Sequence, residues 1–164
     1  MEEAAYCMEQ ATDRCKMYCG EKNQMYSALS EELARMYNAA GRREESLACH
    51  LAVRNQLLKN GYREGSLLLM VDNNMSVVYL DLGKPEEAIP YLTEALELAK
   101  ENGLVGPAVA EPTWNLARVY RALGDEEKED IYLKAAVEGF RECYPPEHPK
   151  RIAAEQRLKE RQGE

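Results

Sequence analysis

Two histidines and one cysteine pair are the residues whose chemistry could support metal binding or catalysis. Cys15 and Cys19 are four residues apart in a helical pattern, so their thiols share one helix face. A structural zinc site needs four ligands, and the sequence holds no second pair of this kind. We therefore predict two thiols packed at a helix interface and no metal. We expect His50 and His148 to be surface or helix-cap residues rather than ligands or general bases.

The sequence lacks the patterns that nucleophilic and acid–base catalysis require. Its glycines are isolated and form neither a phosphate-binding loop nor a Gly-x-Ser-x-Gly elbow. Its many carboxylates crowd helix starts and exposed faces, where a solvated surface explains them, and no pair stands out as an acid and base. We predict no enzymatic activity and no cofactor.

A set of asparagine, arginine and tryptophan side chains could instead bind a polypeptide. An asparagine amide carries a donor and an acceptor, so it can pair with the backbone of an extended peptide. Arginine forks suit carboxylates, and the single tryptophan could anchor a ligand. The plainer interpretation is cap or surface asparagines, a core tryptophan, and arginines paired with glutamates. The candidate residues are Arg35, Asn38, Asn73, Asn74, Trp114, Asn115, Arg118 and Arg121.

A repeated pattern indicates the elements that must position these side chains. Three segments share the order Leu/Met, Ala/Ser, x, x, Tyr, x, x, x, Gly and end at Gly41, Gly83 and Gly124. These glycines are spaced 42 and then 41 residues apart. Each glycine suits the end of a helix, and a second stretch with apolar or small residues at helical intervals follows it. The pattern therefore predicts repeated pairs of helices.

The same periodicity predicts where the helices lie. We expect eight helices, at about 2–18, 23–40, 43–59, 63–82, 85–101, 107–123, 126–143 and 147–162. They form one domain over 1–164, with repeats at about 21–61, 62–103 and 104–144 between half repeats 1–20 and 145–164. The half repeats indicate either a piece of a longer array or two caps, and the charged tail can serve as a solvated cap.

These repeats resemble the tetratricopeptide repeat (TPR) family. The Leu-Ala-x-x-Tyr-x-x-x-Gly run and the Glu-Glu-Ala-x-x-Tyr-x-x-x-Ala run at 86–95 are close to its pattern. The period exceeds the usual one of roughly 34 residues, and Glu147-His148-Pro149 leads into a new helix. Both features resemble the long-period subtype of kinesin light chains. The resemblance implies an all-α, right-handed solenoid of antiparallel helix pairs that binds proteins.

Two positions depart from this pattern. In the family, asparagines at the places of Asn74 and Asn115 commonly pair with a peptide backbone, and the first repeat has Glu32 there instead. Glu129 stands where the other repeats have the small residues Ser46 and Ala88, which predicts looser packing in the third repeat.

Composition and charge limit the partners. The 164 residues are 45% hydrophobic and 30% charged, as in a soluble globular protein, and no apolar run is long enough to cross a membrane. A net charge of −8 argues against nucleic acid and anionic membranes. The acidic start does not resemble a secretory signal, so we expect a cytoplasmic protein with free thiols.

We therefore expect an adaptor or scaffold whose first helices line a concave groove. This groove would bind an extended, partly acidic segment of another protein. Two alternatives stay open at this point. One is a structural module that self-associates through exposed terminal half repeats, and the other is a regulatory or sensory domain of a larger protein.

Overall fold

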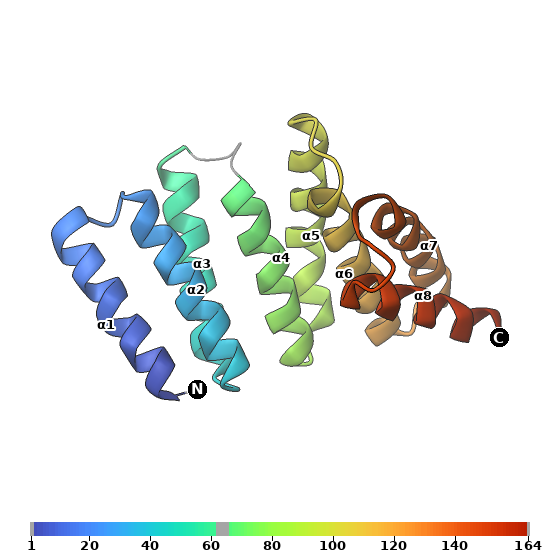
Figure 1. The fold of residues 1–164 in the computed structure, drawn as a ribbon, viewed down its shortest axis with the longest axis horizontal. Coiled ribbons are helices and arrows are strands. Elements are labelled where there is room, and N and C mark those ends of the chain that lie inside the picture. Colours follow the sequence, from blue (N-terminus) through green and yellow to red (C-terminus); the bar gives the residue numbers. More distant parts are fainter. Residues whose placement is uncertain (1, 62–65, 164) are drawn as a thin grey trace. The chain divides into compact units, whose positions relative to one another are not determined.

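The structure, a computed structural model, describes residues 2–61 and 66–163. All of the secondary structure in this part of the chain is helical (Figure 1), which confirms the predicted all-α repeat fold. The helices are α1 (Glu2–Cys19), α2 (Gln24–Ala39), α3 (Arg43–Lys59), α4 (Ser66–Asp81), α5 (Pro85–Glu101), α6 (Pro107–Leu123), α7 (Glu126–Cys143) and α8 (Pro149–Gln162).

Capping residues explain the small differences between predicted and observed helix ends. Asn23 precedes α2 instead of opening it, because its side-chain oxygen accepts a hydrogen bond from the N–H of Met25 at 2.8 Å. His148 caps α8 in the same way and accepts from the N–H of Lys150 at 3.3 Å, as its helix-cap prediction requires. The predicted start of the fourth helix at 63 lies outside the described residues.

The spacing between tyrosine and glycine in the repeat pattern reflects how each first helix ends. In α2, the N–H of Arg42 donates to the carbonyl of Tyr37 at 2.9 Å, and Gly41 between them has a φ of 81°. In α6, the N–H of Asp125 donates to the carbonyl of Tyr120 at 3.0 Å around Gly124. Positive φ is strained for residues with a Cβ, so this closing bond selects glycine.

The described chain forms two compact units, Met1–Leu82 and Gly83–Glu164. In the first unit, α2 packs against α1, α3 and α4, and α3 also packs against α4. In the second unit, α6 packs against α5 and α7, and α7 packs against α8. The boundary falls inside the predicted repeat 62–103, and the single domain over 1–164 remains a prediction.

Small residues allow the helices of a pair to approach closely. Ala34 and Ser46 are fully buried where α2 meets α3, and the Ser46 hydroxyl donates to the Ala34 carbonyl at 2.7 Å. Where α6 meets α7, a Cβ added at Gly139 would lie 2.9 Å from the Cβ of Ala110. The core of the second unit is built around this contact, from Ala110, Ala117, Leu133, Val137, Phe140 and Ala154.

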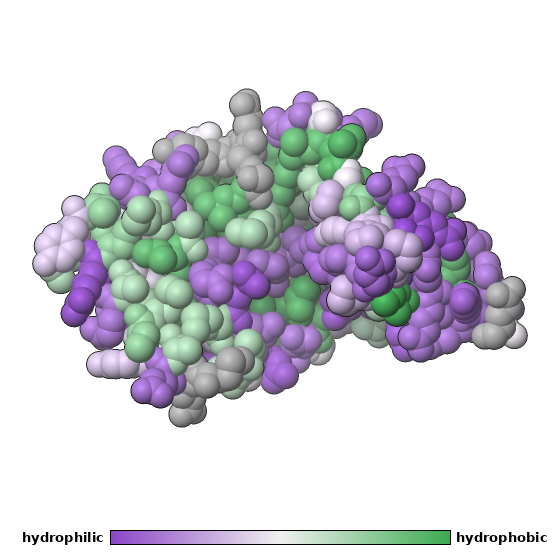
Figure 2. Space-filling view, viewed as in Figure 1, coloured by the Kyte–Doolittle hydropathy of each residue, from purple (hydrophilic) through white to green (hydrophobic). Residues whose placement is uncertain are grey.

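The last helix presents a hydrophilic surface. Figure 2 shows mainly hydrophilic residues over α8, and both Lys159 and Glu160 are exposed. Ala154 is its one fully buried residue and packs into the core of the second unit. This arrangement agrees with the prediction of a solvated cap in the charged tail.

Candidate functional site

Six of the eight predicted binding residues line two surface hollows, one in each unit. The α2–α4 hollow, of about 190 Å³, lies in the first unit and is lined by Arg35, Asn38, Ala39, His50, Asn74, Val77 and Val78. The α6–α8 hollow, of about 80 Å³, lies in the second unit and is lined by Trp114, Ala117, Arg118, Arg121, Glu129 and Arg157. The other two predicted residues, Asn73 and Asn115, are buried.

A buried carboxylate lies next to the α2–α4 hollow. Glu31 and His50 each have a side-chain exposure of 1%, and Nδ1 of His50 lies 2.7 Å from Oε2 of Glu31. The second carboxylate oxygen, Oε1, accepts a hydrogen bond from Nδ2 of Asn74 at 2.7 Å. Both oxygens of Glu31 therefore have partners, as a buried carboxylate requires. The prediction of a surface or helix-cap role for His50 is wrong, because packing of α3 on α2 buries its ring against Glu31.

The rim of the α2–α4 hollow is polar and partly exposed. Nη1 of Arg35 lies 2.7 Å from Oε2 of Glu32, in an ion pair that solvent screens. Nδ2 of Asn38 donates to Oδ2 of Asp81 at 3.4 Å. Glu32, which replaces asparagine in the first repeat, thus forms an ion pair with Arg35.

The α6–α8 hollow combines an indole ring with guanidinium groups. Trp114 packs edge-on against Phe140, with ring centroids 6.4 Å apart, and its ring is only partly buried. Arg118 donates to Oδ1 of Asn115 at 3.0 Å. Arg121 is exposed on the same face of α6. The buried Asn115 therefore orients Arg118, a role that differs from that of the partly exposed Asn74.

Glu129 closes the other side of the α6–α8 hollow. It is 3% exposed. Arg157 on α8 donates two hydrogen bonds to its carboxylate, from Nε to Oε1 at 2.7 Å and from Nη2 to Oε2 at 3.1 Å. This pair occupies the place where Ser46 and Ala88 lie in the other repeats, and the hollow adjoins it. The sequence revealed the departure at Glu129 but not the partner that compensates for it.

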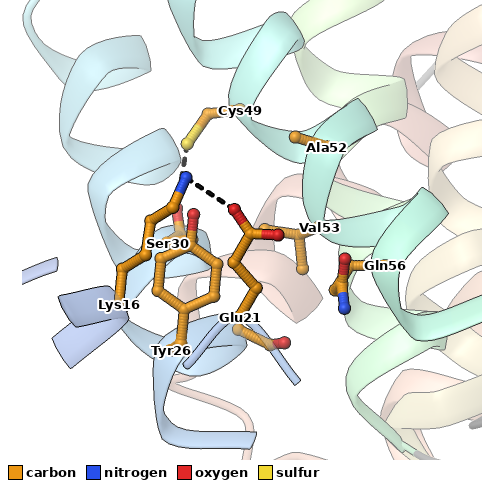
Figure 3. Close-up of a pocket in the computed structure, with 9 residues that line it drawn as sticks. Lys16, Glu21, Tyr26, Ser30, Cys49, Ala52, Val53 and Gln56 are labelled. Atoms are coloured by element: carbon orange, nitrogen blue, oxygen red, sulfur yellow. Dashed lines mark hydrogen bonds and ion pairs between the residues drawn. The ribbon is translucent and has the colours of Figure 1, made fainter. Parts of the chain in front are cut away.

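A third hollow, of about 250 Å³, lies among α1, α2 and α3 (Figure 3). Its charged residues, Lys16 and Glu21, pair with each other at 2.6 Å. Burial raises the pKa of the Cys49 thiol to about 11, and this thiol donates to the Ser30 carbonyl at 3.3 Å. The thiol is thus protonated and poorly nucleophilic at neutral pH. Sequence reasoning missed this hollow, because its lining comes from three helices without a shared pattern.

The predicted thiol interface is only half correct. Cys15 is buried and burial raises the pKa of its thiol, whereas Cys19, one turn further along α1, is exposed. No group of three or more histidine, cysteine, aspartate or glutamate residues in the described chain is arranged to hold a metal ion. A separate point concerns membranes: none of the described helices is long and apolar enough to span a bilayer.

Comparisons with known proteins support the repeat fold. Residues 67–142 match the tetratricopeptide repeat family. The fold is similar to crystal structures of nearly identical TPR-like repeats assigned to a kinesin light chain of Podosopora anserina. One, a Q17M variant, aligns with a TM-score of 0.80 and 23% identity over 99% of this chain and 78% of that one. The other aligns with a TM-score of 0.78, 23% identity and coverage of 99% and 79%.

A further solved structure has a similar fold. BtubC (BKLC) from P. vanneervenii aligns with a TM-score of 0.78 and 18% identity, over 99% of this chain and 73% of that one. No curated protein matches the chain.

Proposed function

Because residues 67–142 carry tetratricopeptide repeats and the chain has the repeat fold of kinesin light chain structures, we propose that it is a protein–protein interaction scaffold. Its first helices bind an extended segment of another protein. One observation carries the proposal: the structure gathers six of the eight predicted binding residues around two hollows that the first helices line. Repeat arrays generally use this face for binding.

The chemistry of the two hollows suits a polypeptide ligand. The amide of Asn74 is partly exposed and can bond to a peptide backbone. The indole of Trp114 offers a rigid apolar surface, and aromatic anchors of this kind dominate many interfaces. Arg121 is exposed beside it and can reach a carboxylate of the ligand.

The test begins with a partner captured from the source cell and reduced to its shortest binding segment. Its affinity is then measured by calorimetry for the wild type, Asn74→Ala, Trp114→Ala and Arg121→Ala. We expect Trp114→Ala to weaken binding at least tenfold, which corresponds to about 1.4 kcal/mol. Arg43→Ala, an exposed arginine on α3 away from both hollows, is the matched control. Unchanged affinity in all three variants, with melting temperatures near that of the wild type, would exclude this binding face.

A second candidate function is self-association through α1. Large apolar side chains are exposed on and near this helix: Tyr6 is 60% exposed, Met17 73%, Tyr18 82% and Met25 61%. Exposed apolar groups of this size favour contact with another protein surface. Light scattering over a concentration series separates the candidates, because self-association increases the mass with concentration. Tyr18→Glu would then restore the monomer mass, and a constant mass for the wild type would exclude this candidate.

A further inference from the structure

We propose that the α2–α4 hollow binds a cationic side chain of the bound segment and that the Glu31–His50 pair positions Asn74 to receive it. This inference rests on the proposed function, since it assigns a ligand chemistry to one of the two hollows. It also assigns a role to Glu31 and His50, which the sequence analysis left without one.

The first step concerns the orientation of the Asn74 amide. A carboxylate only accepts hydrogen bonds, so the groups that face Glu31 at 2.7 Å must both donate. Asn74 therefore presents its NH₂ group to Glu31, and its carbonyl oxygen is left for the hollow that it lines. Within the described residues no protein group bonds to that oxygen. Rotating the amide would bring two acceptor oxygens together in a buried place, which is unfavourable.

The same reasoning applies to His50. Its Nδ1 lies 2.7 Å from Oε2 of Glu31, so it must carry a hydrogen and donate to that carboxylate. His50 lines the hollow together with Asn74. The hollow therefore offers the carbonyl oxygen of Asn74 as an acceptor, and it is complementary to a ligand group that carries N–H donors.

The second step concerns charge. Three carboxylates, those of Glu31, Glu32 and Asp81, lie beside the hollow, each bonded to a residue that lines it, and the lining itself carries the guanidinium of Arg35. Solvent screens the exposed pair of Arg35 and Glu32, but it screens the buried Glu31 far less. The field at the hollow therefore favours a cation.

The third step concerns size and apolar lining. A volume of about 190 Å³ corresponds to roughly six water molecules, which suits the end of one long side chain. Val77, Val78 and Ala39 can contact the methylene stem of such a side chain while the polar residues receive its charged end. The α6–α8 hollow has the opposite character, with three arginines around one glutamate. An acidic ligand group thus suits the α6–α8 hollow, and a basic one suits the α2–α4 hollow.

The test uses two probes with the same four-carbon stem, of which only one carries a terminal ammonium group: Nα-acetyl-lysine methylamide and Nα-acetyl-norleucine methylamide. Each is titrated into ¹⁵N-labelled protein while the side-chain NH₂ signals of Asn74 and Asn38 are followed. We expect the lysine probe to shift the Asn74 signal with saturation and to bind at least tenfold more tightly than the norleucine probe. Equal binding of the two probes, or shifts only at other residues, would overturn the inference without any variant.

Glu31→Gln tests the positioning role, because glutamine removes the charge and lets the amide of Asn74 rotate. The tenfold preference for lysine over norleucine should disappear in this variant. Glu44→Gln, an exposed glutamate in the first turn of α3, removes the same charge in the same unit and should keep the preference. If Glu31→Gln keeps the preference, the positioning role is wrong. If Glu31→Gln fails to fold, Asn74→Ala takes its place, because it removes the carbonyl oxygen that receives the cation, and the same loss of preference is expected.

The inference and the proposed function can fail separately. With an identified binding segment, replacing its basic residues by norleucine tests the cation site alone. If Trp114→Ala weakens binding but these replacements do not, the scaffold function stands and the cation site is refuted. If neither these replacements nor any of Asn74→Ala, Trp114→Ala and Arg121→Ala affects affinity, both are refuted.

Discussion

The pair of Glu129 and Arg157 gives the sharpest test of how the second unit is held together. Arg157→Met removes the guanidinium and keeps an unbranched apolar stem, so the Glu129 carboxylate stays buried without its cation. Removing one partner of a buried pair costs about 3 to 5 kcal/mol. The side chain of Arg157 is 20% exposed, so water can partly replace the guanidinium. We therefore expect a loss near the lower limit, about 3 kcal/mol.

A double variant separates the buried charge from simple loss of contacts. Glu129→Ala restores the kind of small residue that Ser46 and Ala88 provide in the other repeats, and it removes the charge that needs a partner. Combined with Arg157→Met, it should recover most of the lost free energy of unfolding, because no unpaired carboxylate remains buried. The two substitutions are therefore strongly non-additive in a double-mutant cycle.

The assay is urea unfolding followed by the fluorescence of Trp114, the single tryptophan, which lines the same hollow and so reports on the second unit. Arg161→Met is the matched control. It removes an arginine of the same helix, whose partners Glu126 and Asp130 are 75% and 37% exposed, and it should cost less than about 1 kcal/mol. The reasoning is refuted if Arg157→Met costs no more than this control, or if the double variant is less stable than Arg157→Met alone.

Three further predictions follow from local geometry. Gly139→Ala should destabilise the second unit by about 1 to 3 kcal/mol in thermal unfolding, because the new methyl group meets the rigid Cβ of Ala110; an unchanged midpoint would mean that α6 and α7 separate freely. Gly41→Ala should cost about 1 to 2 kcal/mol through its positive φ alone, since nothing lies within 4 Å of the added Cβ, and Gly41→Asn should cost less. At pH 8, iodoacetamide should modify the exposed Cys19 quickly and Cys49 slowly, because a pKa of about 11 leaves only about one thiolate in a thousand; mass mapping that finds equal rates would contradict this burial.

The sequence by itself determined the helices and the repeat. Helix ends depend on bonds between residues within one or two turns, such as the one from the N–H of Arg42 to the carbonyl of Tyr37. Such bonds require certain residues at a fixed spacing, here a tyrosine followed four residues later by a glycine. This spacing is visible in the sequence. The same local logic placed His148 at a helix start. The positions of the six candidate residues beside the two hollows were also predictable in outline, because equivalent positions of a repeat fall on equivalent faces of its helices.

The tertiary structure alone decided what these side chains contact. His50 meets Glu31 across 19 residues, and Arg157 meets Glu129 across 28 residues, so neither pair lies within the range of helical periodicity. Asn74 and Asn115 are equivalent in sequence, yet one bonds to a buried glutamate and the other orients an arginine. These partners depend on which side chains the packed helices bring within about 3 Å. A buried carboxylate requires such a partner, but no local pattern in the chain specifies which residue it is.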